Sequence, residues 1–381
     1  MNFDLSPEQK LLKDRITAFC ENECAAELKT MLENEDVFPS GLYKKIADNG
    51  FFGIPFPVKY GGADGNMVDV MMVTEQMSFY RHDMALIYMV PVVFAGMFLL
   101  ANGTEEQKAT FLPRIIAGEL KYAFAMTEPE AGSDPRGMTT YAAKSGDDYT
   151  ISGTKYWTTG ASVADYIIMV TLTSQEKDQA RGMTVFVVPS SSEHLEITPI
   201  PKLAGNAYPS CQVVLDRVVV PAENIVGGAE AFNTGLSQLR KTADIERLCI
   251  AASCIGTASA ILKDCVAFAK SRIQSGKPII QFQAISHDLA DMATNIEAMR
   301  WMTYHAAWLR SEKRECFKEI SMAKLFCSEI LNTIVKKGMQ IFGGRGYSME
   351  YPMQRYLRES FLSFYAGGTS EIQKNLITRY L

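Results

Sequence analysis

A β-rich block between two helical regions constrains the fold of this chain more than any other feature. Between residues 121 and 225, short apolar runs at 165–172, 183–188 and 211–220 are separated by Gly, Pro, Ser and Asn. No helix of useful length fits between these runs, so they predict an antiparallel sheet or barrel. The polar tract 173–182 is expected to be a hairpin tip of this sheet.

Helical patterns occupy the chain on both sides of this block. Ser6 is a helix-capping residue type, and Glu8 follows it in what would be the first helical turn. Further along, apolar residues at steps of three and four mark one face of a long helix: Ile285, Leu289, Met292, Ile296, Met299 and Met302. The sequence therefore predicts an α+β protein with an N-terminal helical domain (1–120), a middle β domain (121–225) and a C-terminal helical domain (226–381).

Residues 84–101 form an uncharged segment that is near the length of a membrane span. Pro91 and Gly96 interrupt it, so we expect a buried helix broken at Pro91 and no membrane association. The N-terminus lacks a basic region leading into an apolar run, and no signal peptide is predicted. The 8 cysteines are expected to be small buried residues in a reducing cytosol, which predicts a cytoplasmic protein.

Charge and spacing exclude two further classes of function. The formal net charge is −5, and Lys and Arg are scattered, so no basic nucleic-acid surface is indicated. Neither a CxxC pair nor an HxxxH pair occurs, so no metal site is expected.

Four stretches have residue types suited to a binding site: 123–134, 155–161, 272–283 and 339–352. In the first, Gly132 and Ser133 offer backbone N–H groups and a hydroxyl, which suit a phosphate. The last contains a GGRG run, but no strand precedes it and the GxGxxG spacing is absent, so a Rossmann fold is weakly supported. Each stretch alone is a modest signal.

Together, in this order and with these separations, the four stretches resemble the acyl-CoA dehydrogenase family of flavoproteins. The resemblance covers nearly the whole chain and extends to the GTSEIQ run at 368–373. It implies an N-terminal helical domain, a middle β domain and a C-terminal four-helix bundle. It also implies FAD as cofactor and a homotetramer as the assembly.

The resemblance also implies which residues contact FAD. Ser133 and Arg272 would lie at the pyrophosphate, and Gln340 and Gly344 would reach the adenosine of a neighbouring subunit's FAD. Ser275 departs from the family, which usually has Phe there. The full set of implied FAD contacts is Phe124, Met126, Thr127, Ser133, Trp157, Thr159, Arg272, Phe282, Gln283, Gln340, Gly344, Thr369 and Glu371.

The catalytic base is not where many family members have it. The residue before the C-terminal GT is Gly367, which cannot take a proton. The other family arrangement has the base on the helix after the β domain, where Glu246 lies between Asp244 and Arg247, a pair that resembles the family's contact to the pantetheine arm. We therefore expect Glu246 to remove the α-proton of an acyl thioester. The backbone N–H of Gly367 is expected to stabilise the enolate oxygen, and the β-hydride is expected to pass to the flavin N5.

The substrate stays open at this point. The resemblance is interpreted as favouring the branch that oxidises a prolyl group on a carrier protein to a pyrroline- or pyrrole-carbonyl thioester. The first alternative is a dehydrogenase or enoyl-CoA reductase of short or branched acyl-CoA, similar to the isovaleryl or crotonobetainyl enzymes. The second alternative is a catalytically inactive flavin-binding relative. Oxygen or an electron-transfer flavoprotein would accept the electrons.

Overall fold

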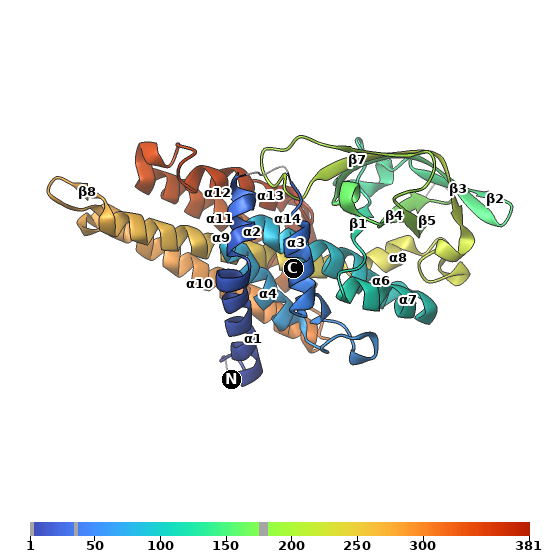
Figure 1. The fold of residues 1–381 in the computed structure, drawn as a ribbon, viewed down its shortest axis with the longest axis horizontal. Coiled ribbons are helices and arrows are strands. Elements are labelled where there is room, and N and C mark those ends of the chain that lie inside the picture. The colour runs from blue at the N-terminus through green and yellow to red at the C-terminus, as the bar shows by residue number, and fades with distance from the viewer. Residues whose placement is uncertain (1–3, 34–36, 175–181) are drawn as a thin grey trace. The chain divides into compact units, whose positions relative to one another are not determined.

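The structure, a computed structural model, describes residues 4–33, 37–174 and 182–381 (Figure 1). The chain forms two compact units. The first is helical and comprises Met1–Glu23, Asn66–Ala85 and Arg247–Leu381. The second comprises Cys24–Gly65 and Leu86–Glu246 and contains the large β-sheet. The predicted α+β class is confirmed, with N-terminal helices, a middle β-sheet and C-terminal helices; the domain boundaries near residues 120 and 225 stay a prediction.

The second unit is built on a seven-stranded sheet with the strand order β1-β4-β2-β3-β7-β6, in which β5 pairs with β4. Its strands are β1 (Tyr122–Ala125), β2 (Tyr141–Ser145), β3 (Asp148–Thr159), β4 (Tyr166–Leu172), β5 (Met183–Pro189), β6 (Leu195–Pro199) and β7 (Ser210–Pro221). The expectation of a purely antiparallel sheet is wrong, because β1 pairs with β4 in parallel and β2 meets β4 in parallel at Tyr141 and Leu172. The expected hairpin tip at 173–182 lies largely outside the described residues, at 175–181.

The strands β4 and β5 pair with each other, and both are almost entirely apolar. All of β4 after Tyr166 is buried, and β5 is buried from Met183 to Val188. Continuous apolar runs of this kind are typical of strands covered on both faces. Their side chains pack into one core with residues of the neighbouring strands, including Ile151, Ile167, Met169, Phe186 and Val213.

Short helices complete the second unit, and α6, α7 and α8 lie beside the strands (Figure 1). These helices are α2 (Ala25–Glu33), α3 (Ser40–Asp48), the later part of α5 (His82–Met89), a π-helix (Val90–Met97), α6 (Phe98–Asn102), α7 (Glu105–Ile116) and α8 (Gly235–Arg240). The expected break at Pro91 is wrong. The chain continues through Pro91 as a π-helix, and this local change in helix type accommodates the missing N–H of the proline.

The first unit is a set of long helices, and α9, α10 and α11 run side by side (Figure 1). A small hairpin, β8 (Ile273–Gln274) and β9 (Lys277–Pro278), joins α9 to α10 at one end. The helices are α1 (Pro7–Ala18), α4 (Met67–Tyr80), α9 (Ala243–Ser271), α10 (Gln283–Ser311), α11 (Phe317–Phe342), α12 (Met353–Ser360), α13 (Leu362–Tyr365) and α14 (Ser370–Ile377).

Close packing of α4 against α9 depends on Gly256. A Cβ at this position would lie 2.1 Å from the carbonyl oxygen of Glu75, so any side chain would force the two helices apart. The predicted buried face of α10 is confirmed for Leu289, Met292, Ile296 and Met299. Ile285 and Met302 are only half-buried, and Thr303 is buried in the turn of Met302.

Two helical segments are long and apolar enough to cross a membrane, His82–Asn102 and Gly235–Ser271. Their apolar windows are 72% and 78% buried inside the protein. Core helices of this length and composition have the same property, so the segments are weak evidence for a membrane span.

Candidate functional site

The turn between β1 and β2, which contains Met126, Thr127 and Ser133, is held in place by the buried carboxylate of Glu128. This carboxylate accepts hydrogen bonds from the backbone N–H groups of Thr139 (2.6 Å) and Thr140 (3.0 Å) and from the Lys155 ammonium (2.8 Å). The ammonium also donates to the carbonyl oxygen of Met126 at 3.1 Å. The turn is therefore tied to β3 by one buried ion pair, whose side chains are 3% and 0% exposed.

The same contacts set the ionisation of Glu128. Burial by itself would raise the pKa of this carboxyl group. The charge of Lys155 and the hydrogen bonds from Lys155, Thr140 and Thr139 outweigh burial and hold the pKa below its ordinary value of 4.5. Glu128 is therefore a structural anion that orders the turn, and its paired, ionised carboxylate has little basicity for proton abstraction.

Trp157 lies two residues after Lys155 and has an unusual conformation. Its φ is +60°, a region that few non-glycine residues adopt, and the pairing of β3 with β7 shifts register between Lys155 and Thr158. The side chain is 53% exposed. A strained backbone that presents a large aromatic surface to solvent is typical of a site for a flat ligand.

The other predicted FAD contacts of the second unit differ in their exposure to solvent and in their packing. Met126 and Thr127 are half-buried beside the Glu128 turn, and Ser133 is exposed. Phe124 packs edge-on against Phe98, with ring centroids 5.5 Å apart. The Thr159 hydroxyl shares a 3.0 Å hydrogen bond with the Ser210 hydroxyl. The structure thus brings Met126, Thr127 and Trp157 to one region of the sheet, whereas Phe124 and Thr159 are partly engaged within the protein.

The first turn of α9 contains the predicted base. Asp244 is buried and accepts a hydrogen bond from the backbone N–H of Ile245 at 3.0 Å. Glu246 is half-buried. Carboxylates are favoured at this end of a helix, where the backbone N–H groups and the helix dipole are positive. Glu246 and Arg247 are adjacent in the sequence, and the structure shows which group the Arg247 side chain contacts.

Arg247 bonds to the glycine loop, which we define as Gly367 and Gly368 between α13 and α14. Its Nε donates to the carbonyl oxygen of Gly367 at 3.1 Å. Both glycines have positive φ, +63° and +92°, so a side chain at either position would be strained. The loop is therefore held at a conformation that glycine adopts readily.

The chain enters α14 directly after the glycine loop. Thr369 is the N-cap, and its hydroxyl accepts from the backbone N–H of Ile372 at 3.3 Å. Glu371 is exposed, and hydrogen bonds from its own backbone N–H and from Thr369 lower the pKa of its carboxyl group. A lowered pKa makes Glu371 a weaker base, which favours Glu246 for proton abstraction.

The remaining predicted FAD contacts lie at the ends of α9, α10 and α11 in the first unit. Arg272 is half-buried where α9 ends, and Lys277 covers the Phe282 ring with its ammonium 4.4 Å from the centroid. Gln283, Gln340 and Gly344 are exposed. A Cβ at Gly344 would meet no atom within 4 Å, so the site there is open.

Ser275, which departs from the family pattern, is at the tip of the β8–β9 hairpin. Its φ is +50°, and Gly276 follows with +77°. A small polar residue tolerates this conformation better than Phe does. The local turn geometry therefore accounts for the departure.

These surroundings fit FAD. In the second unit, an exposed aromatic side chain suits the flavin ring, and the exposed turn at Gly132 and Ser133 has open space beside it and backbone N–H groups for phosphate. In the first unit, Arg272 offers a cation for the pyrophosphate. Each unit thus supplies groups of the chemistry that the cofactor requires.

Sequence reasoning missed four residues of this region: Glu128, Lys155, Lys324 and Gln373. Lys324 and Gln373 are buried and bond to the glycine loop. One signal was available for Lys324, since it is the single cation among the mostly apolar buried residues of α11. A lysine in such a position needs buried acceptors.

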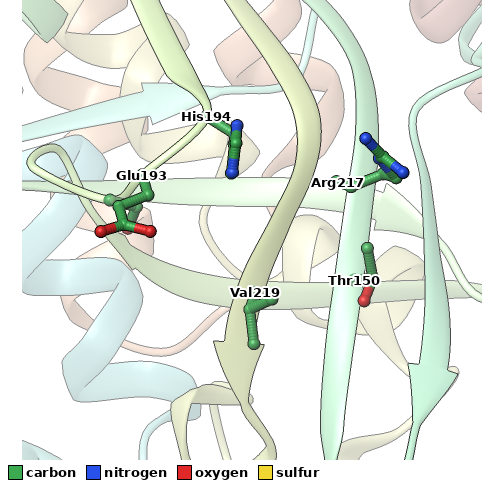
Figure 2. A pocket seen from close by; sticks show the side chains of 6 residues that line it. Thr150, Glu193, His194, Arg217 and Val219 are labelled. Carbon is green, nitrogen blue, oxygen red and sulfur yellow. The ribbon is translucent and has the colours of Figure 1, made fainter.

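A shallow hollow on the β-sheet is a separate feature (Figure 2). It is lined by Thr150, Ser192, Glu193, His194, Arg217 and Val219. None of these is a predicted site residue, and Arg217 forms an ion pair with the neighbouring Asp216, with Nε and Oδ1 3.5 Å apart. Within the described residues, no group of three or more His, Cys, Asp or Glu side chains could hold a metal ion.

Replacing Trp157 with Ala is expected to weaken FAD binding roughly 3- to 10-fold, because an aromatic stacking contact contributes about 0.5–1.5 kcal/mol. Titration of the apoprotein with FAD, followed by flavin fluorescence, measures the change. Trp308→Phe is the matched control, since Trp308 is an exposed tryptophan of α10 outside the predicted site. Equal FAD affinity in the Trp157→Ala and Trp308→Phe proteins would show that Trp157 does not contact the cofactor.

Comparison with known proteins gives consistent matches along the chain. Residues 6–119, 123–218 and 233–381 match the family models of the N-terminal, middle and C-terminal domains of acyl-CoA dehydrogenases. The chain is 37% identical to a probable acyl-CoA dehydrogenase of Bacillus subtilis, YngJ, over 100% of both chains. It is 36% identical to the caffeyl-CoA reductase–Etf complex subunit CarC of Acetobacterium woodii, over 99% of this chain and 98% of the other.

Solved structures agree with these matches. Butyryl-CoA dehydrogenase from Megasphaera elsdenii superposes with a TM-score of 0.94 at 30% identity, over 100% of this chain and 99% of the other. The FAD complex of PigA gives 0.94 at 27% identity, over 100% and 99%. The prolyl acyl carrier protein oxidase AnaB gives 0.90 at 27% identity, over 99% of each chain.

Proposed function

Because this chain belongs to the acyl-CoA dehydrogenase family, and is thus an FAD-dependent oxidoreductase of acyl thioesters, we propose that its substrate is a short or branched acyl-CoA. The observation that supports the proposal is the class of substrate for which its relatives are named. The two relatives at 37% and 36% identity are named for CoA thioesters, and a neighbour at 30% identity is a butyryl-CoA dehydrogenase.

The prolyl-carrier interpretation has less support than this alternative. The neighbour named as a prolyl acyl carrier protein oxidase is 27% identical, whereas the butyryl-CoA dehydrogenase is 30% identical in the same structural comparison. Asp244 and Arg247 do not discriminate, because CoA and a carrier protein share the same pantetheine arm. The prolyl-carrier substrate therefore becomes an outcome of the test below.

In the proposed reaction, Glu246 removes the α-proton of the thioester, and the electron pair of the C–H bond moves toward the carbonyl oxygen. The N–H of Gly367 donates a hydrogen bond to this oxygen as its negative charge develops. Arg247 holds the glycine loop through the Gly367 carbonyl oxygen, which is 3.1 Å from its Nε. When bound, the flavin supplies the acceptor for the β-hydride.

We further propose that Met126, Thr127 and Trp157 contact the flavin ring and that Ser133 and Arg272 contact the pyrophosphate. The name of the relative CarC includes an Etf complex, which supports an electron-transfer flavoprotein over oxygen as the acceptor. A cytoplasmic homotetramer completes the proposal, and in it Gln340 and Gly344 would meet a neighbouring subunit's FAD. Light scattering of the purified protein tests the assembly.

Anaerobic bleaching of the bound flavin tests the substrate. Butyryl-CoA and isovaleryl-CoA are expected to bleach the flavin, whereas a prolyl-carrier protein is not. The measurement is the loss of visible flavin absorbance after mixing, with free CoA as the control for thiol reduction. Bleaching by the prolyl-carrier protein alone would overturn the CoA assignment and leave thioester oxidation standing. If neither the acyl-CoA esters nor the prolyl-carrier protein bleach the flavin, the result would support the hypothesis that the protein is a catalytically inactive flavin-binding relative.

A further inference from the structure

The carbonyl oxygens of the glycine loop are bound on one side by buried polar side chains. Lys324 of α11 donates from Nζ to the Gly368 oxygen at 2.8 Å, and Gln373 of α14 donates from Nε2 to the Gly367 and Gly368 oxygens at 3.0 Å each. Lys324 and Gln373 are both 0% exposed. Two fully buried side chains from different helices thus converge on a two-residue loop.

These contacts belong to a longer row on α11, the polar seam, which we define as Lys324, Ser328 and Asn332. The hydroxyl of Ser328 donates to the Ser363 oxygen at 2.9 Å, and Asn332 donates to the Ser360 oxygen at 3.3 Å. The three residues are one helical turn apart, so they face the same side of α11. Only Lys324 reaches the glycine loop; the other two hold α12 and α13.

Backbone geometry transmits this anchoring to the N–H side of the loop. The peptide bonds are trans, so the N–H of Gly368 points opposite to the Gly367 oxygen, and the N–H of Thr369 points opposite to the Gly368 oxygen. Hydrogen bonds from Arg247 and Gln373 to the Gly367 oxygen restrict rotation about ψ of Gly367. Because φ of Gly367 is +63°, the direction of its own N–H is then set as well. Glycine would otherwise be free to rotate at both positions.

We propose that Lys324 and Gln373 are positioning residues for the reaction: they hold the glycine loop so that its N–H donors face the thioester carbonyl. The inference rests on the proposed function, because an N–H donor matters only if an enolate forms. Neither side chain touches the reacting atoms, so both act through the backbone.

Hydrogen exchange at the substrate's α-carbon isolates the step that these residues would assist. The probe is (methylthio)acetyl-CoA, in which sulfur replaces the β-carbon of butyryl-CoA, so no β-hydride can leave. Its α C–H bond breaks, Glu246 takes the proton, and a solvent deuteron returns to the carbon in D2O. Mass spectrometry of the recovered ester measures deuterium incorporation independently of turnover.

Lys324→Met is expected to slow this exchange roughly 10- to 100-fold, which is less than the cost of about 10²- to 10³-fold for removing an oxyanion donor itself, because Lys324 acts through the backbone. Gln373→Met, which removes both of its loop contacts and keeps the volume, is expected to slow it about 10-fold and provides the test if Lys324→Met does not fold. The dissociation constant of the ester is expected to change less than about threefold in both, since the ground-state carbonyl has little charge.

Ser328→Ala is the matched control, because Ser328 is buried one turn from Lys324 in the same seam and bonds to Ser363 instead of the loop. It is expected to retain wild-type exchange. Exchange at the wild-type rate in the Lys324→Met or Gln373→Met protein would overturn the positioning role alone. If the wild-type protein exchanges neither this ester nor a carrier-bound prolyl thioester, the proposed function is wrong and the positioning role falls with it.

Discussion

Replacing Glu246 with Gln is expected to slow bleaching of the bound flavin by an acyl-CoA about 10²- to 10⁴-fold, the usual contribution of a positioned general base. Gln has nearly the shape of Glu but cannot accept the α-proton at neutral pH. FAD affinity is expected to stay unchanged, because the proposed role of Glu246 concerns the substrate. Stopped-flow absorbance under anaerobic conditions measures the rate, and the ratio of flavin to protein absorbance measures FAD content.

Two variants make this test specific. Glu230→Gln removes an exposed carboxylate of the second unit and is expected to retain the wild-type rate. Glu371→Gln removes the carboxylate of the C-terminal run, which is the competing candidate base. If the large loss appears in Glu371→Gln and not in Glu246→Gln, the base has been assigned to the wrong residue.

Replacing Lys155 with Met is expected to lower the free energy of unfolding by about 3–5 kcal/mol, because it leaves the buried carboxylate of Glu128 without its cation. The turn that carries Met126, Thr127 and Ser133 would lose its side-chain link to β3 and keep only the backbone hydrogen bond from the Tyr156 N–H to the Thr127 oxygen, so FAD affinity is expected to fall as well. Urea unfolding of the apoprotein, followed by circular dichroism, measures the first effect. FAD titration measures the second.

The exposed pair of Asp134 and Arg136 provides the control, because it lies in the same turn and its side chains are 58% and 76% exposed. Asp134→Asn is expected to leave the unfolding midpoint unchanged. An equally small effect of Lys155→Met would show that the Glu128 ion pair does not order the turn.

The contribution of the Glu128 carboxylate to the free energy of unfolding depends on pH in a predictable direction. The pKa of Glu128 is lower in the folded protein than its ordinary value of 4.5, so the folded state favours the carboxylate. Its stabilising contribution is therefore present above about pH 4.5 and is lost as the pH falls below that value. The stability difference between the wild-type protein and Glu128→Gln is expected to shrink over the same range.

Local pattern was sufficient for most helices and strands. The apolar spacing of α10 and the apolar runs of β4 and β5 are properties of neighbouring residues, and each predicted an element that the structure contains. The parallel pairing of β1 with β4 was not predictable in this way. It joins Tyr122 to Tyr166 across intervening strands, and no local pattern specifies such a partner.

Residue types at fixed separations along the chain were enough to predict the order of helical and β regions and the family, and they also indicate Glu246 as the candidate base. Only the tertiary structure showed that Glu128 bonds Lys155, 27 residues away, and that Lys324 bonds Gly368, 44 residues away. It also assigned the positive φ of Trp157. The physical reason is burial. In the sequence, a charged residue is expected to be a solvated surface residue, but once the fold removes water from it, its side chain must form hydrogen bonds within the protein.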